Sequence, residues 1–451
     1  MKKNKVMNEI VSLCKRRGYI FQSSEIYGGL NAIWDSGPLG VELKNNIKRW
    51  WLYNMVQLRP DVEGLDSAIL MHPRVWEASG HIENFTDPLI ECRNCHKRFR
   101  DDEITKDRCP SCGAQELTEP RMFNLMFKTF IGPVESEDNT IFLRPETAQG
   151  IYVNYQNVMV ATRQKFPFGI AQIGKAFRNE ISPGNFIFRS REFEQMELQF
   201  FVNPDDGDKW FDYWREQRSQ WYLSLGIDQD KIHWHEHGKN ELAHYALAAY
   251  DIEFDFPFGR KELEGVHNRG NFDLSRHQEF SGKKITARFT DDNAEGGFIE
   301  KIPFIIETSG GIDRCMLAVL TDAYTVEPEV SNPSKMRTVL KMHPRLSPIK
   351  VGVFPLVKKE GMPEVAREIA QELRREFMVF YDEKDSIGRR YRRQDEAGTP
   401  FCVTVDGQTL DDKTVTIRER DTLVQVRSKI EEIAPMIRNY IETWERNKGI
   451  E

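Results

Sequence analysis

The sequence predicts a large α+β domain built on an antiparallel sheet, followed by a small α/β domain. Two neighbouring segments of alternating pattern, residues 172–180 and 191–200, are typical of strands that pair through a short loop. Two prolines and several charges in residues 341–348 indicate a linker. Beyond this linker, strand patterns alternate with helical ones, as they do in small α/β domains.

Length and composition are those of a soluble globular protein. The chain has 451 residues, of which 39% are hydrophobic and 29% charged, and its formal net charge is −7. A large core is therefore possible, in two or three domains. The negative balance gives no global basic signal, so any RNA binding must use local patches. The absence of a long apolar run and of a signal-peptide pattern predicts a cytoplasmic protein without a membrane span.

The remaining elements of the large domain follow in order. Residues 1–17 predict a helix with Ile10, Val11 and Leu13 on its apolar side. A longer helix begins near Pro38, since proline suits a first turn, and it ends before Pro60. Residues 65–70 then predict a strand, and residues 302–306 predict another, which leads into a helix near residue 313.

The paired segments carry different residues on their two faces. In the second segment, Met196, Leu198 and Phe200 share an apolar face. The other face presents Arg191, Phe193, Gln195, Glu197 and Gln199, and the first segment adds Gln172, Gly174, Ala176, Arg178 and Glu180.

A sheet with one face in water would show part of this pattern, but it does not explain small residues beside an arginine and carboxylates, or an aromatic placed among them. An aromatic ring can stack on a base, a guanidinium can bind phosphate, and a buried carboxylate can bind an ammonium. The face therefore predicts a nucleotide and an amine bound side by side.

Four of the seven cysteines form two Cys-x2-Cys pairs separated by 13 residues: Cys92, Cys95, Cys109 and Cys112. Four thiolates at this spacing predict a closed, structural Zn²⁺ site in an insertion at residues 91–113. A metal-free reduced loop and regulatory disulfides are the alternatives.

Three histidines, His233, His235 and His237, alternate along one strand face. A second metal site is conceivable there, but a half-exposed strand is favoured.

The C-terminal pattern predicts a mostly parallel core. Its expected strands are residues 351–355, 378–381, 401–405 and 414–418, and its expected helices are residues 364–377, 386–397 and 424–444. Residues 389–393 hold four arginines and a tyrosine within about one and a half turns. RNA contact through phosphates and stacking is one interpretation. The nearby Asp385, Asp395 and Glu396 favour the other, a solvated helix face with ion pairs.

Three segments resemble, in chain order, the motifs of class II aminoacyl-tRNA synthetases, and in particular those of homodimeric glycyl-tRNA synthetases. They are Leu143–Gly150, Phe177–Glu180 with Arg191–Phe193, and Glu307–Arg314. The resemblance covers essentially the whole chain. It implies a catalytic domain of the class II synthetase fold at residues 1–343, with a zinc-ribbon-like insertion and an inter-motif segment at 203–300. Residues 349–446 resemble an anticodon-binding domain.

This resemblance implies ATP-dependent attachment of glycine to tRNA(Gly) through a glycyl-adenylate, with Mg²⁺, structural Zn²⁺ and a homodimer. Neither step needs a covalent protein nucleophile, because positioning and charge neutralisation suffice. A catalytically inactive, synthetase-like RNA-binding protein is the alternative, and a synthetase for proline, threonine or serine is a third possibility.

The resemblance also assigns residues. It implies that Arg178 contacts the α-phosphate, that Phe193 stacks on adenine, and that Arg314 covers the other face of the base. Arg178 and Arg314 are the expected catalytic residues. The expected ATP-binding residues are Arg178, Asn179, Glu180, Phe188, Arg189, Arg191, Phe193, Glu262 (a candidate Mg²⁺ ligand), Leu263, Gly311 and Arg314. The expected glycine-binding residues are Arg100, Glu146, Phe193, Glu197, Glu307, Ser309 and Gly311. Alternatively, Glu146 caps a helix and Arg100 is a surface charge of the cysteine-rich loop.

Overall fold

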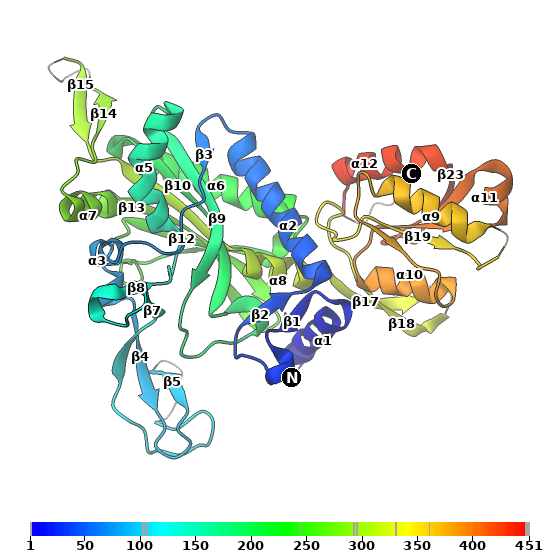
Figure 1. Cartoon of the computed structure of the whole chain (residues 1–451), viewed down its shortest axis with the longest axis horizontal. Coiled ribbons are helices and arrows are strands. Elements are labelled where there is room, and N and C mark those ends of the chain that lie inside the picture. Colours follow the sequence, from blue (N-terminus) through cyan, green and yellow to red (C-terminus); the bar gives the residue numbers. More distant parts are fainter. Residues whose placement is uncertain are drawn as a thin grey trace.

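The computed structural model describes residues 2–101, 104, 107–243, 245–291, 294, 296–329, 332–359 and 361–446. Figure 1 shows a large N-terminal body and a smaller C-terminal lobe beside it. None of the described helices is long and apolar enough to cross a membrane.

A seven-stranded sheet forms the centre of the large body. Its strand order is β11 (Ile232–Glu236), β12 (Ala248–Phe256), β13 (Gly259–Gly270), β16 (Phe304–Gly311), β10 (Glu192–Val202), β9 (Phe168–Phe177) and β3 (Val62–Gly64). All neighbours pair antiparallel except β3 and β9. The predicted antiparallel sheet is confirmed, and the two alternating segments are the neighbours β9 and β10.

Helices cover both faces of this sheet. They are α1 (Lys2–Arg17), α2 (Pro38–Leu52), α5 (Ala148–Thr162), α6 (Gly207–Ser224), α7 (Phe272–Ser281) and α8 (Ile312–Ala323). Met196, Leu198 and Phe200 of β10 pack in one core with α2, α6 and α8. Phe201 of the same strand packs in a second core with α5 and α7. The period-two prediction for β10 is therefore confirmed, and its polar face lies on the side of α5.

One predicted strand is wrong. Residues 65–70 are not a strand, because the pairing with β9 ends at Gly64 and Leu65. Ser67 instead turns its hydroxyl and carbonyl toward buried polar side chains, accepting from Arg144 and donating to Gln172. Leu70 makes only an isolated bridge with Leu143.

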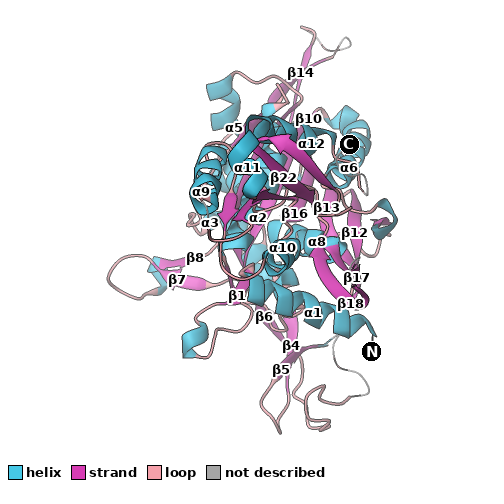
Figure 2. Cartoon of the chain, turned by 90° about the vertical axis from the view of Figure 1, so that its right-hand side faces the viewer, coloured by secondary structure: helices cyan, strands magenta, loops and turns pink. Residues whose placement is uncertain are grey.

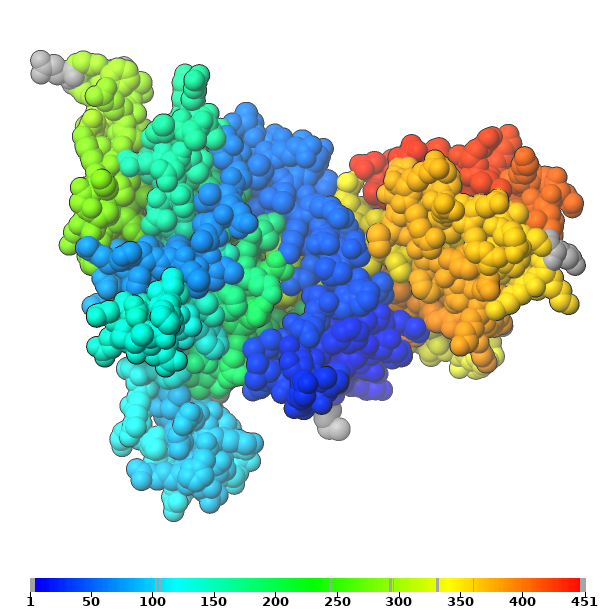
Figure 3. Space-filling model, viewed as in Figure 1, coloured from blue at the N-terminus to red at the C-terminus, as the bar shows by residue number. Residues whose placement is uncertain are grey.

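Smaller elements connect and decorate the sheet. They are β1 (Ile20–Gln22) with β2 (Trp34–Ser36), α3 (Arg74–Ala78), α4 (His81–Asn84), β7 (Lys128–Phe130) with β8 (Thr140–Phe142), and β14 (Ala287–Thr290) with β15 (Phe298–Lys301). The cysteine-rich segment belongs to a separate sheet of β4 (Thr86–Glu91), β5 (Arg98–Arg100) and β6 (Arg121–Asn124). This segment projects from the body in Figure 3. In Figure 2, its strands β4 and β5 lie at the bottom of the view, at the opposite end of the molecule from β14.

The C-terminal lobe has a five-stranded sheet in the order β20 (Val379–Tyr381), β19 (Val351–Pro355), β21 (Phe401–Val405), β22 (Thr414–Glu419) and β23 (Gln425–Lys429). Its helices are α9 (Met362–Leu373), α10 (Ile387–Glu396), α11 (Gly407–Asp412) and α12 (Ile433–Thr443). The first three strands pair in parallel, and β22 pairs antiparallel with both β21 and β23. The long helix predicted at 424–444 is wrong in its first part, because residues 425–429 pair with β22 as a strand.

Buried arginines join the lobe to the body. Arg337 of the hairpin β17 (Tyr324–Glu329) and β18 (Asn332–Leu340) donates to Asp395 at 3.0 Å, and Arg418 donates to the same carboxylate at 2.9 Å. Arg420 donates to the carbonyl of Met342 at 2.8 Å. From α1, Arg17 pairs with Glu396. The lobe is therefore held in place by polar contacts at its base.

The ion pair of Arg218 on α6 and Glu264 on β13 is the basis of a stability prediction. Both side chains are at most 1% exposed, and Tyr222 donates to Glu264 at 2.9 Å. Replacing Arg218→Met leaves a buried carboxylate without its cation, which should destabilise the fold by about 3–5 kcal/mol. Urea unfolding followed by far-UV circular dichroism measures this loss.

The matched control is Arg215→Met on the same helix, since the side chain of Arg215 is 37% exposed. It should change stability by less than about 1 kcal/mol. Equal urea midpoints for the two variants would contradict the importance of the buried pair.

Candidate active site

A cavity of about 230 Å³ opens between β10, β13, β16, the start of α8 and the loop that follows β9. It is lined by 13 of the residues that the sequence predicted for ATP or glycine: Glu146, Arg178, Glu180, Phe188, Arg189, Phe193, Glu197, Glu262, Leu263, Glu307, Ser309, Gly311 and Arg314. The fold thus brings together residues that are up to 168 positions apart in the chain.

Three predicted residues do not line this cavity. Arg100 lies on β5 and pairs with Asp87 at 2.9 Å. The backbone N–H of Asn179 donates to Leu125 at 2.7 Å, and the guanidinium of Arg191 donates to the carbonyls of Asn31 and Glu180. Arg191 and Asn179 therefore hold the loop between β9 and β10, and the roles predicted for all three stay predictions.

Aromatic rings and guanidinium groups form one end of the cavity. The guanidinium of Arg178 lies 5.3 Å from the ring centre of Phe193, and that of Arg314 lies 4.5 Å from the ring centre of Phe188. Arg314 Nη1 is 3.1 Å from a carboxylate oxygen of Glu262. Burial would raise the pKa of Glu262, but the charge of Arg314 lowers it. This end combines flat rings with cations, as a nucleotide requires.

Carboxylates line the other end, and the first of them, Glu307, is compensated. Glu307 is 4% exposed. Arg269 Nη1 is 3.2 Å from both of its oxygens, and Gln199 donates to it at 2.7 Å. Burial would raise the pKa of Glu307, but Arg269, and after it His267, keep this pKa well below its usual range. His267 Nδ1 lies 3.1 Å from Glu307 Oε1. Glu307 is therefore an ionised and already neutralised carboxylate.

Glu146 is also compensated. His81 Nε2 is 3.4 Å from Glu146 Oε2, and Gln149 donates to its other oxygen at 3.0 Å. Burial would raise the pKa of Glu146, but the neighbouring His81 lowers it to about 2.

Glu197 differs from both, because it has no cation in direct contact among the described residues. It is 1% exposed and accepts only from the hydroxyl of Thr147 and the amide of Gln199. Burial raises its pKa well above the usual value, and the charges of Glu307 and Glu146 raise it further. A buried carboxylate that lacks only a cation is a receptor for a small ammonium group.

The residues that arrange this end were not predicted. Arg269 is held by Asp273 at 2.8 Å and lies 3.8 Å from the ring centre of Tyr245. Its contact with Glu307 arises from the pairing of β13 with β16. Gln199 was placed on the correct face of β10 by the period of two, and only its role as a link between Glu197 and Glu307 was missed.

The sequence pattern placed Gly174 on the predicted ligand-binding face. In the structure, its lack of a side chain leaves space for another residue of the protein and not for a ligand. A Cβ atom at Gly174 would lie 2.2 Å from Nη2 of Arg144. Arg144 is 2% exposed and donates to the carbonyls of Lys175 and Ser67. The small residue makes room for a buried arginine of the fold.

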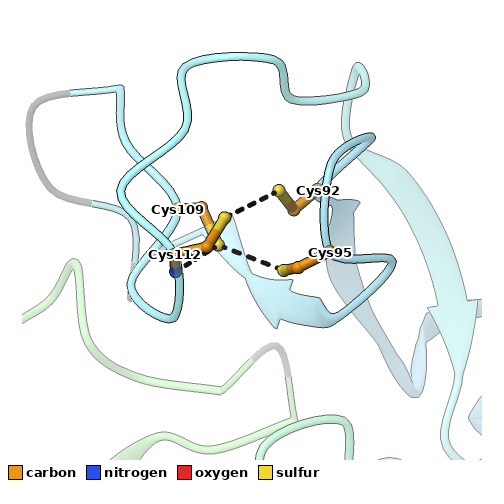
Figure 4. Close-up of side chains that lie close together, drawn as sticks. All are labelled: Cys92, Cys95, Cys109 and Cys112. Atoms are coloured by element: carbon orange, nitrogen blue, oxygen red, sulfur yellow. Dashed lines mark hydrogen bonds between the residues drawn. The ribbon is translucent and has the colours of Figure 1, made fainter.

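The four clustered cysteines meet outside this cavity. Figure 4 shows Cys92 and Cys95 on one loop facing Cys109 and Cys112 on another. The sulfur atoms all lie within 4.8 Å of one another, with two pairs at 3.6 Å. Thiolates bound at about 2.3 Å around one tetrahedral Zn²⁺ lie about 3.8 Å apart. In the part of the chain that the structure describes, this is the one group of metal-binding side chains with such spacing.

His233 and His235 lie on β11, and His237 directly follows it. Each of these three histidines lies close to a different carboxylate. His233 is 2.7 Å from Asp255, His235 is 3.5 Å from Glu241, and His237 is 2.9 Å from Asp251. The favoured interpretation, a partly exposed strand, agrees with this arrangement.

Comparisons with known proteins agree with the geometry. The chain matches the class II core domain of tRNA synthetases (G, H, P, S and T) over residues 129–323, and the anticodon binding domain over residues 350–440.

Relatives match over almost their whole length. A glycine–tRNA ligase of Treponema denticola is 57% identical over 98% of both chains. That of Borrelia hermsii is 52% identical over 96% of this chain and 97% of its own, and that of Treponema pallidum is 50% identical over 98% and 100%. At this identity and coverage, the chain belongs to the glycine–tRNA ligase family of class II aminoacyl-tRNA synthetases.

Proposed function

We propose that this chain attaches glycine to tRNA(Gly) in two steps at the cavity described above. In the first, the glycine carboxylate attacks the α-phosphorus of ATP, which forms glycyl-adenylate and releases pyrophosphate. In the second, a ribose hydroxyl at the end of the tRNA takes the glycyl group and releases AMP. The observation that carries the proposal is Glu197, a buried carboxylate that lines the cavity and has no cation in direct contact in the described part of the chain.

Glycine offers an ammonium and a carboxylate, and no side chain to bind. The ammonium enters beside Glu197, and Ser309 adds a hydrogen-bonding hydroxyl on the neighbouring strand, opposite Glu197 in the pairing of β10 with β16. Larger amino acids are excluded by size. Because no natural amino acid is smaller, this exclusion needs no editing step.

ATP occupies the other end of the cavity. Phe193 stacks on adenine, and Arg178 and Arg314 bind the phosphates and stabilise the charge that develops there. Glu262, which pairs with Arg314, would help to hold Mg²⁺, since proteins commonly bind this ion through one or two carboxylates together with substrate phosphates. The metal neutralises phosphate charge when it is bound.

The C-terminal lobe, residues 349–446, contacts the tRNA anticodon. Its basic run divides into two kinds of residue. Arg390 is 3% exposed and donates to the carbonyls of Pro355 and Asp382, so it supports the lobe itself. The side chain of Arg389 is 75% exposed and that of Arg392 is 53% exposed, so these two carry the proposed RNA contact.

The four cysteines hold a structural Zn²⁺ in the insertion at residues 91–113. The catalytic domain at residues 1–343 forms a homodimer, as the resemblance of the chain to homodimeric glycyl-tRNA synthetases implies. The protein works in the cytoplasm, where tRNA and ATP are available.

The activity is tested by amino-acid-dependent ATP–pyrophosphate exchange across all twenty amino acids, followed by charging of tRNA. Exchange with glycine alone, and charging of tRNA(Gly), are expected. Exchange with proline, threonine or serine would contradict the glycine assignment. If no amino acid supports exchange while tRNA still binds, the inactive RNA-binding alternative replaces the proposal.

The role of Glu197 is tested by Glu197→Gln, which keeps the shape and removes the charge. The KM for glycine should rise roughly 10- to 100-fold, since a hydrogen bond to a charged group contributes about 1.5–3 kcal/mol. The KM for ATP should change little.

The control is Glu192→Gln, which removes a carboxylate of the same strand that pairs with exposed Lys175. It should leave the KM for glycine near that of the unaltered protein. An equal rise in both variants would contradict a specific ammonium site at Glu197.

Zinc is tested by metal analysis of the purified protein. About one Zn²⁺ per chain is expected, and Cys109→Ser should lose it because a tetrahedral site needs all four thiolates. His96→Ala should keep it, although His96 lies beside Cys95 in the same loop. Equal zinc in Cys109→Ser and the unaltered chain would refute the site.

A further inference from the structure

Four charged side chains form a cluster beside the proposed nucleotide end of the cavity, and two of them, Glu194 and Asp313, are among the residues that line it. Lys44 and Lys48 come from α2, Glu194 from β10, and Asp313 from the first turn of α8. Lys44 Nζ lies 2.8 Å from Glu194 and 2.9 Å from Asp313, while Lys48 contacts Glu194 alone. We call these four residues the Lys44 cluster.

The cluster is mostly shielded from water. The side chains of Lys44, Glu194 and Asp313 are 13%, 14% and 15% exposed. Burial lowers the pKa of Lys44, but Asp313 and Glu194 together raise it above its usual value, so the ammonium is held in its charged form. Without this ammonium, Asp313 would lose its lysine partner, and only Lys48 would remain beside Glu194.

The two carboxylates adjoin the residues proposed to hold ATP. Glu194 directly follows Phe193, and Asp313 directly precedes Arg314. The backbone N–H of Glu194 also donates to Asp313 Oδ2 at 3.0 Å. Strand β10 and the start of α8 are therefore joined twice, once by this hydrogen bond and once through Lys44.

We propose that Lys44 is a positioning residue for the nucleotide end of the active site. By bridging Glu194 and Asp313, it sets the spacing between Phe193 and Arg314 without contacting substrate. This role rests on the function proposed above and adds α2 to the elements that arrange the ATP site.

The glycine end is held by other residues. Gln199 links Glu197 to Glu307, and Arg269 neutralises Glu307. None of these four residues belongs to the Lys44 cluster. Loss of Lys44 should therefore impair ATP much more than glycine, whereas a general loss of folding would affect both.

The test is steady-state pyrophosphate exchange by Lys44→Met in the full-length protein. The KM for ATP should rise at least about tenfold, while the KM for glycine should change less than about threefold. Lys44→Arg restores a cation between the two carboxylates and should recover most of the loss in ATP affinity.

A double variant tests the mechanism. Lys44→Met with Asp313→Asn also removes the carboxylate that loses its cation, while Lys48 still pairs with Glu194, so its KM for ATP should lie closer to the unaltered value than that of Lys44→Met alone. The matched control is Lys231→Met, because Lys231 Nζ lies 2.8 Å from Asp322 near the far end of the same helix α8. Its two KM values should stay near those of the unaltered protein.

The proposal is overturned if Lys44→Met raises the two KM values equally, if Lys231→Met has the same effect as Lys44→Met, or if the double variant is worse for ATP than Lys44→Met. Absence of glycine-dependent exchange in the unaltered protein would instead overturn the proposed function. The two failures are thus distinguishable.

Discussion

The candidate active site depends on how the fold compensates three carboxylates that line one cavity, of which Glu197 and Glu307 are buried and Glu146 is half-buried. A buried carboxylate is costly unless a cation or several donors accompany it. Arg269 neutralises Glu307, and His81 accompanies Glu146, while Glu197 receives only neutral donors. Among the described residues, Glu197 is therefore the one of the three without a cation in direct contact, and this difference is the basis of the proposed ammonium site.

The sheet makes this arrangement possible because antiparallel pairing sets side chains from distant segments on one face. Glu197 and Ser309 are direct partners in the pairing of β10 with β16, and Glu307 lies opposite His267 in the pairing of β13 with β16. The nucleotide end uses the same strands where they meet α8. Compensating charges lie behind both ends, with Arg269 at the glycine end and Lys44 at the nucleotide end.

Regular periodicity explains what could be predicted from the sequence. The polar face of β10 follows from its period of two, and its neighbour β9 follows from the short loop between them. Arg269 could not be found in this way, because its contact with Glu307 spans 38 residues and exists only once β13 pairs with β16. The strand at 425–429 was mistaken for helix for the same reason, since its pairing with β22 is not visible in local pattern. The sequence does not distinguish the arginines of α10 from one another. In the structure, Arg390 is buried, whereas Arg389 and Arg392 are exposed.

We expect the raised pKa of Glu197 to fall when the ammonium of glycine binds beside this carboxylate, as the proposed function implies. The raised pKa of Glu197 means that the neutral form dominates below that pKa, and the incoming ammonium lowers it. Glycine binding should therefore release a proton in the pH window between the two values, and affinity should rise with pH through it. Isothermal titration calorimetry in buffers of different ionisation enthalpy, between about pH 5 and 8, measures this proton directly. Release of up to one proton that disappears in Glu197→Gln agrees with the account, and glycine binding without proton release at every pH in that range contradicts it.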